Sequence, residues 1–286
     1  MNPVNRFALF ASQILFSVIT PPLLMPGIAK LRFTRSFISF CFGRSYGNRY
    51  QNIIDSFQGR YGLAMAEGLA IAKKIAGDKI FVVADCGTGT GFVTRQAAEQ
   101  FPHATFIAFD ILPGMLTQAR DNCKDISADF FHVQADVFAL PLADESIDLL
   151  LAQNTMPCFT EFARVCRPGG MIIYVDSSAG WIARMAKRLV EKQRLFERVM
   201  WQRVDLGFYV LAQKAGDNKE RNKFFLEGGT KQQKLAMLLR CPLDKGKVAL
   251  ERDYLCCEHH QYPIHDGFPV MLKKNAISEA KKKRAI

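Results

Sequence analysis

The sequence predicts an α/β protein with a doubly wound, seven-stranded sheet and a small β module toward the C-terminal end. Three observations carry this prediction. Apolar runs of strand length alternate with helical patterns between residues 55 and 215, which is typical of a parallel sheet with helices on both faces. A glycine-rich turn follows the first apolar run, and a second apolar stretch follows a polar segment near the C-terminal end.

Each expected element follows from local apolar spacing and turn signals. Residues 55–76 are expected to form a helix, because Leu63, Ala66 and Ala70 recur at helical spacing. Strands are expected at residues 79–84, 105–109, 130–134, 147–152, 171–175, 199–204 and 208–212. The other helices are expected at residues 91–100, 113–122, 161–165 and 182–196. The last two strands are joined near Gly207, which favours an antiparallel pair at the edge of the sheet.

Composition divides the 286 residues into five segments. These are an apolar and basic N-terminal arm (residues 1–54), the α/β domain (55–215), a polar linker (216–237), a small module (238–274) and a basic tail (275–286). Eight scattered cysteines have no spacing typical of a disulfide framework, which favours a reducing compartment. We therefore expect the protein in the cytoplasm or in an organelle matrix.

The net charge of +11 is unevenly distributed along the chain. Residues 1–78 carry nine basic and three acidic side chains, residues 79–176 carry six and twelve, and residues 177–286 carry 23 and 12. Basic flanks around an acidic middle favour an anionic partner such as nucleic acid or a membrane surface. An ordinary solvated surface is the alternative, and RNA is not excluded as a partner.

The N-terminal arm contains an uncharged stretch at residues 7–29, and no acidic residue precedes Asp55. Its length would span a bilayer, but Pro21, Pro22 and Pro26 interrupt a continuous helix. A cleaved signal, an acid-poor targeting segment and a helix packed on its own domain are alternatives. We expect peripheral contact with a membrane, or a cap over the substrate site.

The strongest functional signal is the stretch VVADCGTGTGF, residues 82–92. An apolar run ends at Asp85, and Gly87, Gly89 and Gly91 follow at every second position. In a doubly wound sheet, ligands bind at the carboxyl ends of the strands, where glycines let the backbone approach a nucleotide. A dinucleotide fingerprint would have its third glycine one position later. An acid beside the turn would repel a pyrophosphate, whereas it suits a ligand with a cationic amine.

Four segments in order resemble those of the class I S-adenosylmethionine-dependent methyltransferases. The first is DCGTGTG, which starts at Asp85, and the second is FIAFDILPGMLTQAR, whose strand ends at Asp110, 25 positions later. The third is VQADVFALPLADESIDLLLAQN, and the fourth is FARVCRPGGMIIYVD. The resemblance covers about residues 55–214 and implies a Rossmann-like methyltransferase domain that binds S-adenosylmethionine.

The resemblance also implies a set of cofactor-binding residues. Asp85 is expected near the methionine amine, Asp110 on both ribose hydroxyls, and Asp136 facing the adenine amine. Capping a helix or a turn is the alternative for the last two. Asn154 follows the fourth strand, where family members often contact cofactor or substrate, and a structural turn residue is the alternative. The expected set is Asp85, Gly87, Thr88, Gly89, Gly91, Asp110, Ile111, Asp136, Val137 and Asn154.

The expected reaction is methyl transfer, in which the cofactor supplies the electrophile and the protein supplies binding and orientation. No motif in the core indicates a general base, and we assign no catalytic residue. The uncharged arm, the basic flanks and a resemblance to quinone-type methyltransferases favour a small, hydrophobic or membrane-associated acceptor, lipid-like in character. An RNA base methyltransferase and a non-catalytic, cofactor-binding assembly factor are the alternatives. Residues 148–167 form a shorter stretch than the family has, which leaves the substrate wall undefined.

The C-terminal module carries a candidate zinc site, whose ligands we expect to be Cys241, Cys256 and His260. Cys257 and His259 are adjacent alternatives, and Asp244 stands where a second cysteine of the first pair would be expected. The module resembles the short zinc-binding domain that acts as activator partner for several methyltransferases, including its YPIHDGFPVML ending. Some members of that group look metal-free, so a module without metal is the alternative.

Overall fold

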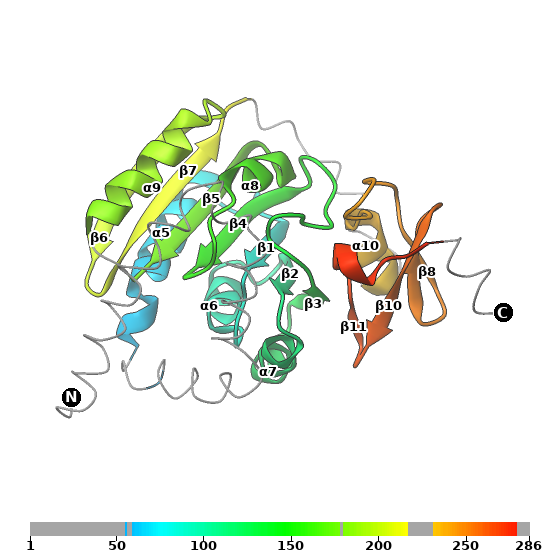
Figure 1. The fold of residues 1–286 in the computed structure, drawn as a ribbon. Coiled ribbons are helices and arrows are strands. Elements are labelled where there is room, and N and C mark those ends of the chain that lie inside the picture. Colours follow the sequence, from blue (N-terminus) through cyan, green and yellow to red (C-terminus); the bar gives the residue numbers. More distant parts are fainter. Residues whose placement is uncertain (1–54, 56–58, 178–179, 217–230, 279–286) are drawn as a thin grey trace.

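The computed structural model describes residue 55 and residues 59–177, 180–216 and 231–278. The N-terminal arm, residues 1–54, lies outside the described residues, and so do the roles predicted for it. The described chain forms a large sheet flanked by helices and a separate small β module (Figure 1). This architecture confirms the fold class predicted from the sequence. Among the described helices, none is both long and apolar enough to cross a membrane.

The large sheet has seven strands in the order β3-β2-β1-β4-β5-β7-β6. Its strands are β1 (Val82–Cys86), β2 (Thr105–Asp110), β3 (Asp129–Gln134), β4 (Ile147–Gln153), β5 (Cys166–Asp176), β6 (Phe196–Val204) and β7 (Gly207–Lys214). The first five are mutually parallel, whereas β7 runs antiparallel to β5 and β6. β1, β2 and β4 are buried along their whole length, which is why apolar residues dominate both of their faces and a regular polar alternation is absent.

Helices cover both faces of this sheet (Figure 1). They are α5 (Leu63–Ala76), preceded by the single turn η1 (Arg60–Gly62), and then α6 (Phe92–Gln100), α7 (Pro113–Cys123), α8 (Phe159–Val165) and α9 (Gly180–Lys192). One core packs α5 and α6 against a face that includes Val83 and Leu149. The other packs α8 and α9 against a face that includes Ala84 and Leu150. Successive residues of one strand thus serve opposite cores.

The strand order reverses between β1 and β4, which is the topological switch point of the sheet. In doubly wound sheets, ligands bind outside the carboxyl ends of the strands at such a point. The parallel register pairs Asp85 of β1 with Leu151 of β4. The glycine turn after β1 therefore lies beside the end of β4.

The C-terminal module packs beside the β3 edge of the large sheet (Figure 1). It consists of helix α10 (Lys231–Leu238), strands β8 (Ala249–Glu251), β9 (Tyr254–Cys256), β10 (His260–His265), β11 (Phe268–Pro269) and β12 (Ile277–Ser278), and the turn η3 (Lys273–Asn275). The strand order is β11-β10-β9-β8, and β12 pairs with β10. The backbone N–H of Met271 donates to Gln134 O at 2.8 Å. Leu239 and Tyr262 are buried in the core that α8 and α9 share, so module and domain pack as one hydrophobic unit.

Several element boundaries differ from the sequence prediction for local reasons. The helix predicted over residues 55–76 is interrupted: Asp55 is helical, but Gly59 adopts a φ of 81° just before η1, and α5 begins at Leu63. Helix α9 ends before Arg194, whose φ of 54° is left-handed, and Phe196 already belongs to β6. The strand predicted at residues 171–175 begins earlier, because the preceding residues from Cys166 form an irregular start of β5.

Two structured pieces lie in segments predicted to be a linker and a tail. Helix α10 occupies the end of the predicted polar linker, where Leu235 is buried in the shared core. Strand β12 lies inside the predicted basic tail, where Ile277 pairs with Gln261. In both cases a few apolar or pairing residues inside a polar segment provide a packing partner that composition alone does not reveal.

Candidate functional site

The glycine turn after β1 packs closely against neighbouring segments. All three glycines of the turn have positive φ angles, which other residues adopt only with strain. A Cβ atom added to Gly87 would lie 2.4 Å from Thr155 Oγ1, and one added to Gly91 would lie 3.0 Å from Ala119 Cα. The backbone N–H of Gly87 donates to Phe109 O at 2.8 Å. The sequence folds into this turn because only bare backbone fits between β4 and α7.

Asp85 is a buried acid at the base of the turn, only 1% exposed. Its Oδ2 accepts a hydrogen bond from Thr94 Oγ1 at 2.5 Å, and the hydroxyl groups of Thr94 and Thr88 lie 2.9 Å apart. Its Oδ1 has no hydrogen-bond partner among the described residues. Burial raises the pKa of Asp85 to about 6. The predicted partner of a cationic amine is therefore a buried carboxyl group with an acceptor to spare.

Asp110 ends β2 and fixes the glycine turn from the other side. Its Oδ2 accepts from Gly89 N and its Oδ1 from Leu112 N, both at 2.9 Å. Burial raises the pKa of Asp110 to about 6. Asp110 does not cap α7, because the N-cap of this helix is Leu112 and has no side-chain cap hydrogen bond. It shapes the turn before the helix, and each carboxylate oxygen keeps acceptor capacity for a ligand hydroxyl. Ile111 O next to it accepts from Gln134 Nε2 at 2.9 Å, which joins the ends of β2 and β3.

Asp136 and Val137 lie in the turn that follows β3. Asp136 Oδ1 accepts from Phe138 N at 2.9 Å, and Asp136 O accepts from Ala139 N at 2.8 Å. Val137 is buried. Asp136 therefore shapes the turn, and its contact with adenine stays a prediction.

Asn154 follows β4 with a left-handed φ of 49°. Its Oδ1 accepts from Ser177 N at 2.9 Å, and its Nδ2 donates to Tyr61 OH at 2.9 Å and to Ser177 Oγ at 3.2 Å. Both ends of the amide are thus used within the protein, as expected for a structural turn residue. A direct contact with cofactor or substrate stays a prediction.

Sequence reasoning missed three residues that the fold brings to the switch point. Tyr61 comes from η1, while Gln153 and Thr155 flank Asn154. Gln153 Nε2 donates to Tyr61 O at 3.2 Å across 92 positions of sequence. Only Gln153 had a local signal, because it is a polar residue at the end of an apolar strand.

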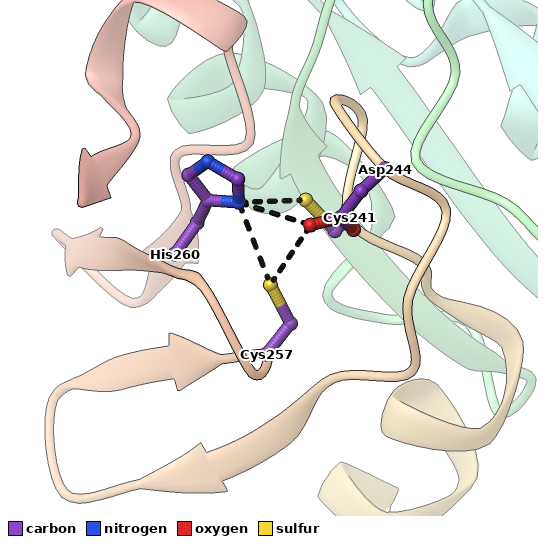
Figure 2. Close-up of side chains that lie close together, drawn as sticks. All are labelled: Cys241, Asp244, Cys257 and His260. Atoms are coloured by element: carbon purple, nitrogen blue, oxygen red, sulfur yellow. Dashed lines mark hydrogen bonds and ion pairs between the residues drawn. The ribbon is translucent and has the colours of Figure 1, made fainter. Parts of the chain in front are cut away.

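A second group of chemistry-bearing residues lies in the C-terminal module (Figure 2). Cys241, Asp244, Cys257 and His260 each offer one ligand atom, and these atoms lie within 4.8 Å of one another. His260 Nδ1 lies 3.6 Å from Cys241 Sγ, 3.8 Å from Cys257 Sγ and 3.1 Å from Asp244 Oδ2. Cys257 Sγ lies 3.9 Å from Asp244 Oδ2. The four side chains converge on one point from two turns of the chain (Figure 2).

The structure places Cys257 in this cluster and leaves the expected ligand Cys256 outside it, and zinc binding itself stays a prediction. Cys256 is the last residue of β9, and its buried Sγ accepts from Gln261 Nε2 at 3.1 Å. Successive residues at a strand end point in opposite directions, so the next residue, Cys257, faces His260. Cys241 and His260 are in the cluster as expected, and Asp244 completes it.

Comparison with known proteins finds relatives of the α/β domain. Residues 83–170 match a family model described as a methyltransferase domain. This part of the chain is similar to methyltransferase domains. Every cofactor-binding residue expected from the sequence lies within the matched residues, whereas the C-terminal module lies outside them.

Curated relatives that match this domain are named for different methyl acceptors. A malonyl-[acyl-carrier protein] O-methyltransferase of Hahella chejuensis is 37% identical over 101 residues, which cover 32% of this chain and 34% of that protein. An arsenite methyltransferase of Halobacterium salinarum is 30% identical over 124 residues, which cover 40% of this chain and 31% of that protein. The chain thus spans about a third of the length of these curated relatives.

A solved structure agrees with the fold of the methyltransferase domain. It is a crystal structure of a protein from Methanococcus maripaludis described as an S-adenosyl-L-methionine-dependent methyltransferase. The TM-score is 0.50 at 16% identity, and the match covers 62% of this chain and 96% of that chain. At this identity the likeness shows the fold.

Proposed function

We propose that the protein transfers a methyl group from S-adenosylmethionine to a small acceptor that is hydrophobic or membrane-associated. The observation that carries the proposal is Asp85, a buried carboxyl group at the switch point whose Oδ1 has no hydrogen-bond partner among the described residues. S-adenosylmethionine carries an ammonium group and a sulfonium, so a buried acceptor beside a bare glycine turn suits it. A ligand with a pyrophosphate there would meet two buried acids, Asp85 and Asp110.

The residues around the turn fit this cofactor. Asp110 can accept from both hydroxyls of a ribose while it holds Gly89 and Leu112. Asp136 and Val137, in the turn after β3, would meet the adenine. Once bound, the cofactor supplies an electrophilic methyl group, and the chain's own residues bind and orient it.

The acceptor class rests on the uncharged N-terminal stretch and the basic flanks of the sequence. Radiolabelled methyl transfer from S-adenosylmethionine to cell extract, followed by separation of lipids, small molecules and RNA, tests it. We expect label in an organic-soluble small molecule. Label in RNA would favour a base methyltransferase, and cofactor binding without any transfer would favour an assembly factor.

Affinity for S-adenosylhomocysteine is expected to fall as the pH drops below about 6. Burial raises the pKa of Asp85 and of Asp110 to about 6, so both carboxyl groups of the free protein take up protons there. A protonated group must ionise before it can accept a charge-assisted hydrogen bond, which costs up to about tenfold in affinity per pH unit and group. Titration calorimetry from about pH 5 to about pH 8 measures this dependence.

Stability should change in the opposite direction over the same pH interval. Asp85 and Asp110 have a higher pKa in the folded protein than the value of 3.8 in the unfolded chain. Their protonated forms therefore stabilise the cofactor-free fold below about pH 4, and this contribution is lost as the pH rises through about 6. In an Asp85→Asn variant, the contribution of Asp85 to the pH dependence of affinity and of stability should be absent. An affinity that does not vary with pH in the wild type would contradict the placement of these acids at the cofactor.

We also propose that the C-terminal module binds one zinc ion through Cys241, Asp244, Cys257 and His260. Zinc bonds of about 2.0–2.3 Å in a tetrahedron place ligand atoms about 3.3–3.8 Å apart. Four of the separations in the cluster are 3.1–3.9 Å and agree with such a site, and all lie within 4.8 Å. Asp244 Oδ1 accepts from Gly246 N at 2.9 Å, which leaves its Oδ2 turned toward the other ligands (Figure 2).

Protein purified without chelator is expected to carry about one zinc per chain. Cys257→Ser should lower this content and loosen the module, because metal binding and folding are coupled in so small a unit. The neighbouring variant Cys256→Ser is the matched control, since Cys256 lies outside the cluster, and it should keep the zinc. Elemental analysis with thermal melting measures both. Equal zinc content in the two variants, or none in the wild type, would remove the site.

A further inference from the structure

Gln153 is a buried glutamine with an unused acceptor at the end of β4. Gln153 is only 5% exposed, and its side-chain Nε2 donates to Tyr61 O at 3.2 Å. Its Oε1 has no hydrogen-bond partner among the residues that the structure describes. A backbone carbonyl only accepts, so the amide nitrogen must face Tyr61 and the oxygen must face elsewhere. A buried acceptor left in this way is costly unless a ligand brings a donor.

The strand register places Gln153 beside the glycine turn. Asp85 pairs with Leu151, so two residues further along the strands Gln153 comes level with Gly87. Alternate residues of a strand share a face, and Leu151 belongs to the core under α5 and α6. Asp85 and Gln153 therefore lie on this same face, and each carries a buried oxygen that finds no donor within the described chain.

Tyr61 links the end of β4 to the start of α6 across the switch point. Its carbonyl accepts from Gln153, and its hydroxyl accepts from Asn154 Nδ2 at 2.9 Å. Its ring meets the ring of Phe92 edge-on, with centroids 5.6 Å apart. Phe92 is the first residue of α6, directly after the glycine turn. These contacts hold the Gln153 amide in one orientation.

We infer that Gln153 is a cofactor-positioning residue, which forms with Asp85 the binding site for the ammonium group of S-adenosylmethionine. This inference rests on the proposed function. An ammonium group has three N–H donors, so a carboxylate and a neutral carbonyl can both accept from it. Binding then satisfies both orphaned oxygens at once, and Tyr61 keeps the amide from turning its own donors toward the cation.

Two ligands that differ in one group test this inference. S-adenosylhomocysteine and 5′-methylthioadenosine share the adenosine and the thioether, but the second lacks the amino-acid portion. Gln153→Leu should weaken S-adenosylhomocysteine by about tenfold, since it removes one hydrogen bond to a charged group. Its affinity for 5′-methylthioadenosine should be unchanged. Titration calorimetry with both ligands measures the selectivity.

Gln213 offers a matched control at the opposite end of the sheet. Its Nε2 donates to Gly169 O at 3.2 Å, and its Oε1 also lacks a partner among the described residues. It pairs with Met171, near the start of β5, far along the strands from the switch point. Gln213→Leu therefore removes an equivalent group and should leave the affinity for both ligands unchanged.

A second variant keeps the test usable if the Gln153→Leu protein does not fold. Tyr61 is half-buried in the short η1 turn, and Tyr61→Ala removes the ring that packs on Phe92. It should weaken S-adenosylhomocysteine selectively as well. An equal loss for both ligands, or no loss for either, in folded Gln153→Leu and Tyr61→Ala overturns the inference. Wild-type protein that binds neither ligand overturns the proposed function itself, which separates the two failures.

Discussion

Replacing Arg167 by methionine should lower the free energy of unfolding by about 3–5 kcal/mol, because a buried carboxylate loses its cation. Arg167 is 9% exposed and Asp148 only 1%. The guanidinium Nε of Arg167 donates to Asp148 Oδ1, and Asp148 Oδ2 accepts from Phe81 N at 2.9 Å and from Val82 N at 2.7 Å. One carboxylate therefore joins the starts of β1, β4 and β5.

The control for this prediction is the exposed pair of Arg95 and Asp125. Their side chains are 42% and 58% exposed, so Arg95→Met should cost at most about 1 kcal/mol. Chemical denaturation measures both variants. Because Asp148 lies at the amino ends of the strands, the Arg167→Met protein that stays folded should keep its cofactor affinity. Equal losses in the two variants would mean that water reaches the Arg167–Asp148 pair.

The fold was predictable because burial on both faces leaves a direct mark in the sequence. Strands such as Val82–Cys86 and Ile147–Gln153 are buried throughout and mostly apolar, and glycines mark the turn that follows the first. The acids at the strand ends were found for the same reason, since a polar residue that closes an apolar run is conspicuous. Contacts distant in sequence leave no such mark. Nothing in the local pattern around Tyr61 indicates that its carbonyl holds Gln153.

The proposed zinc site shows a different limit of sequence reasoning. Cys256 and Cys257 are adjacent, and the spacing to His260 allows either as a ligand. A shift of one residue at a strand end moves a side chain to the other face, so the choice depends on where β9 ends and on its pairing with β10. That pairing matches Cys256 with Gln261, which turns Cys257 toward His260.

Replacing Gly87 by alanine should weaken S-adenosylhomocysteine binding by about 100-fold, equivalent to about 2.7 kcal/mol. The new Cβ would lie 2.4 Å from Thr155 Oγ1 and 2.6 Å from Thr155 Cβ. Thr155 has little room to yield, because Asn154 before it is held by Ser177 and Tyr61. The glycine turn must move instead, and this displaces it from the carboxyl ends of the strands, where the cofactor is proposed to bind.

Backbone strain alone would not produce this loss, and Gly267 separates the two effects. Gly267 has a φ of 82°, close to the 79° of Gly87, but a Cβ added to it meets nothing within 4 Å. Gly267→Ala should therefore cost the left-handed strain of about 1–2 kcal/mol in stability and leave cofactor affinity unchanged. Thermal melting and calorimetry on both variants compare strain with clash. If Gly87→Ala binds S-adenosylhomocysteine as tightly as Gly267→Ala does, the cofactor does not depend on close approach to this turn.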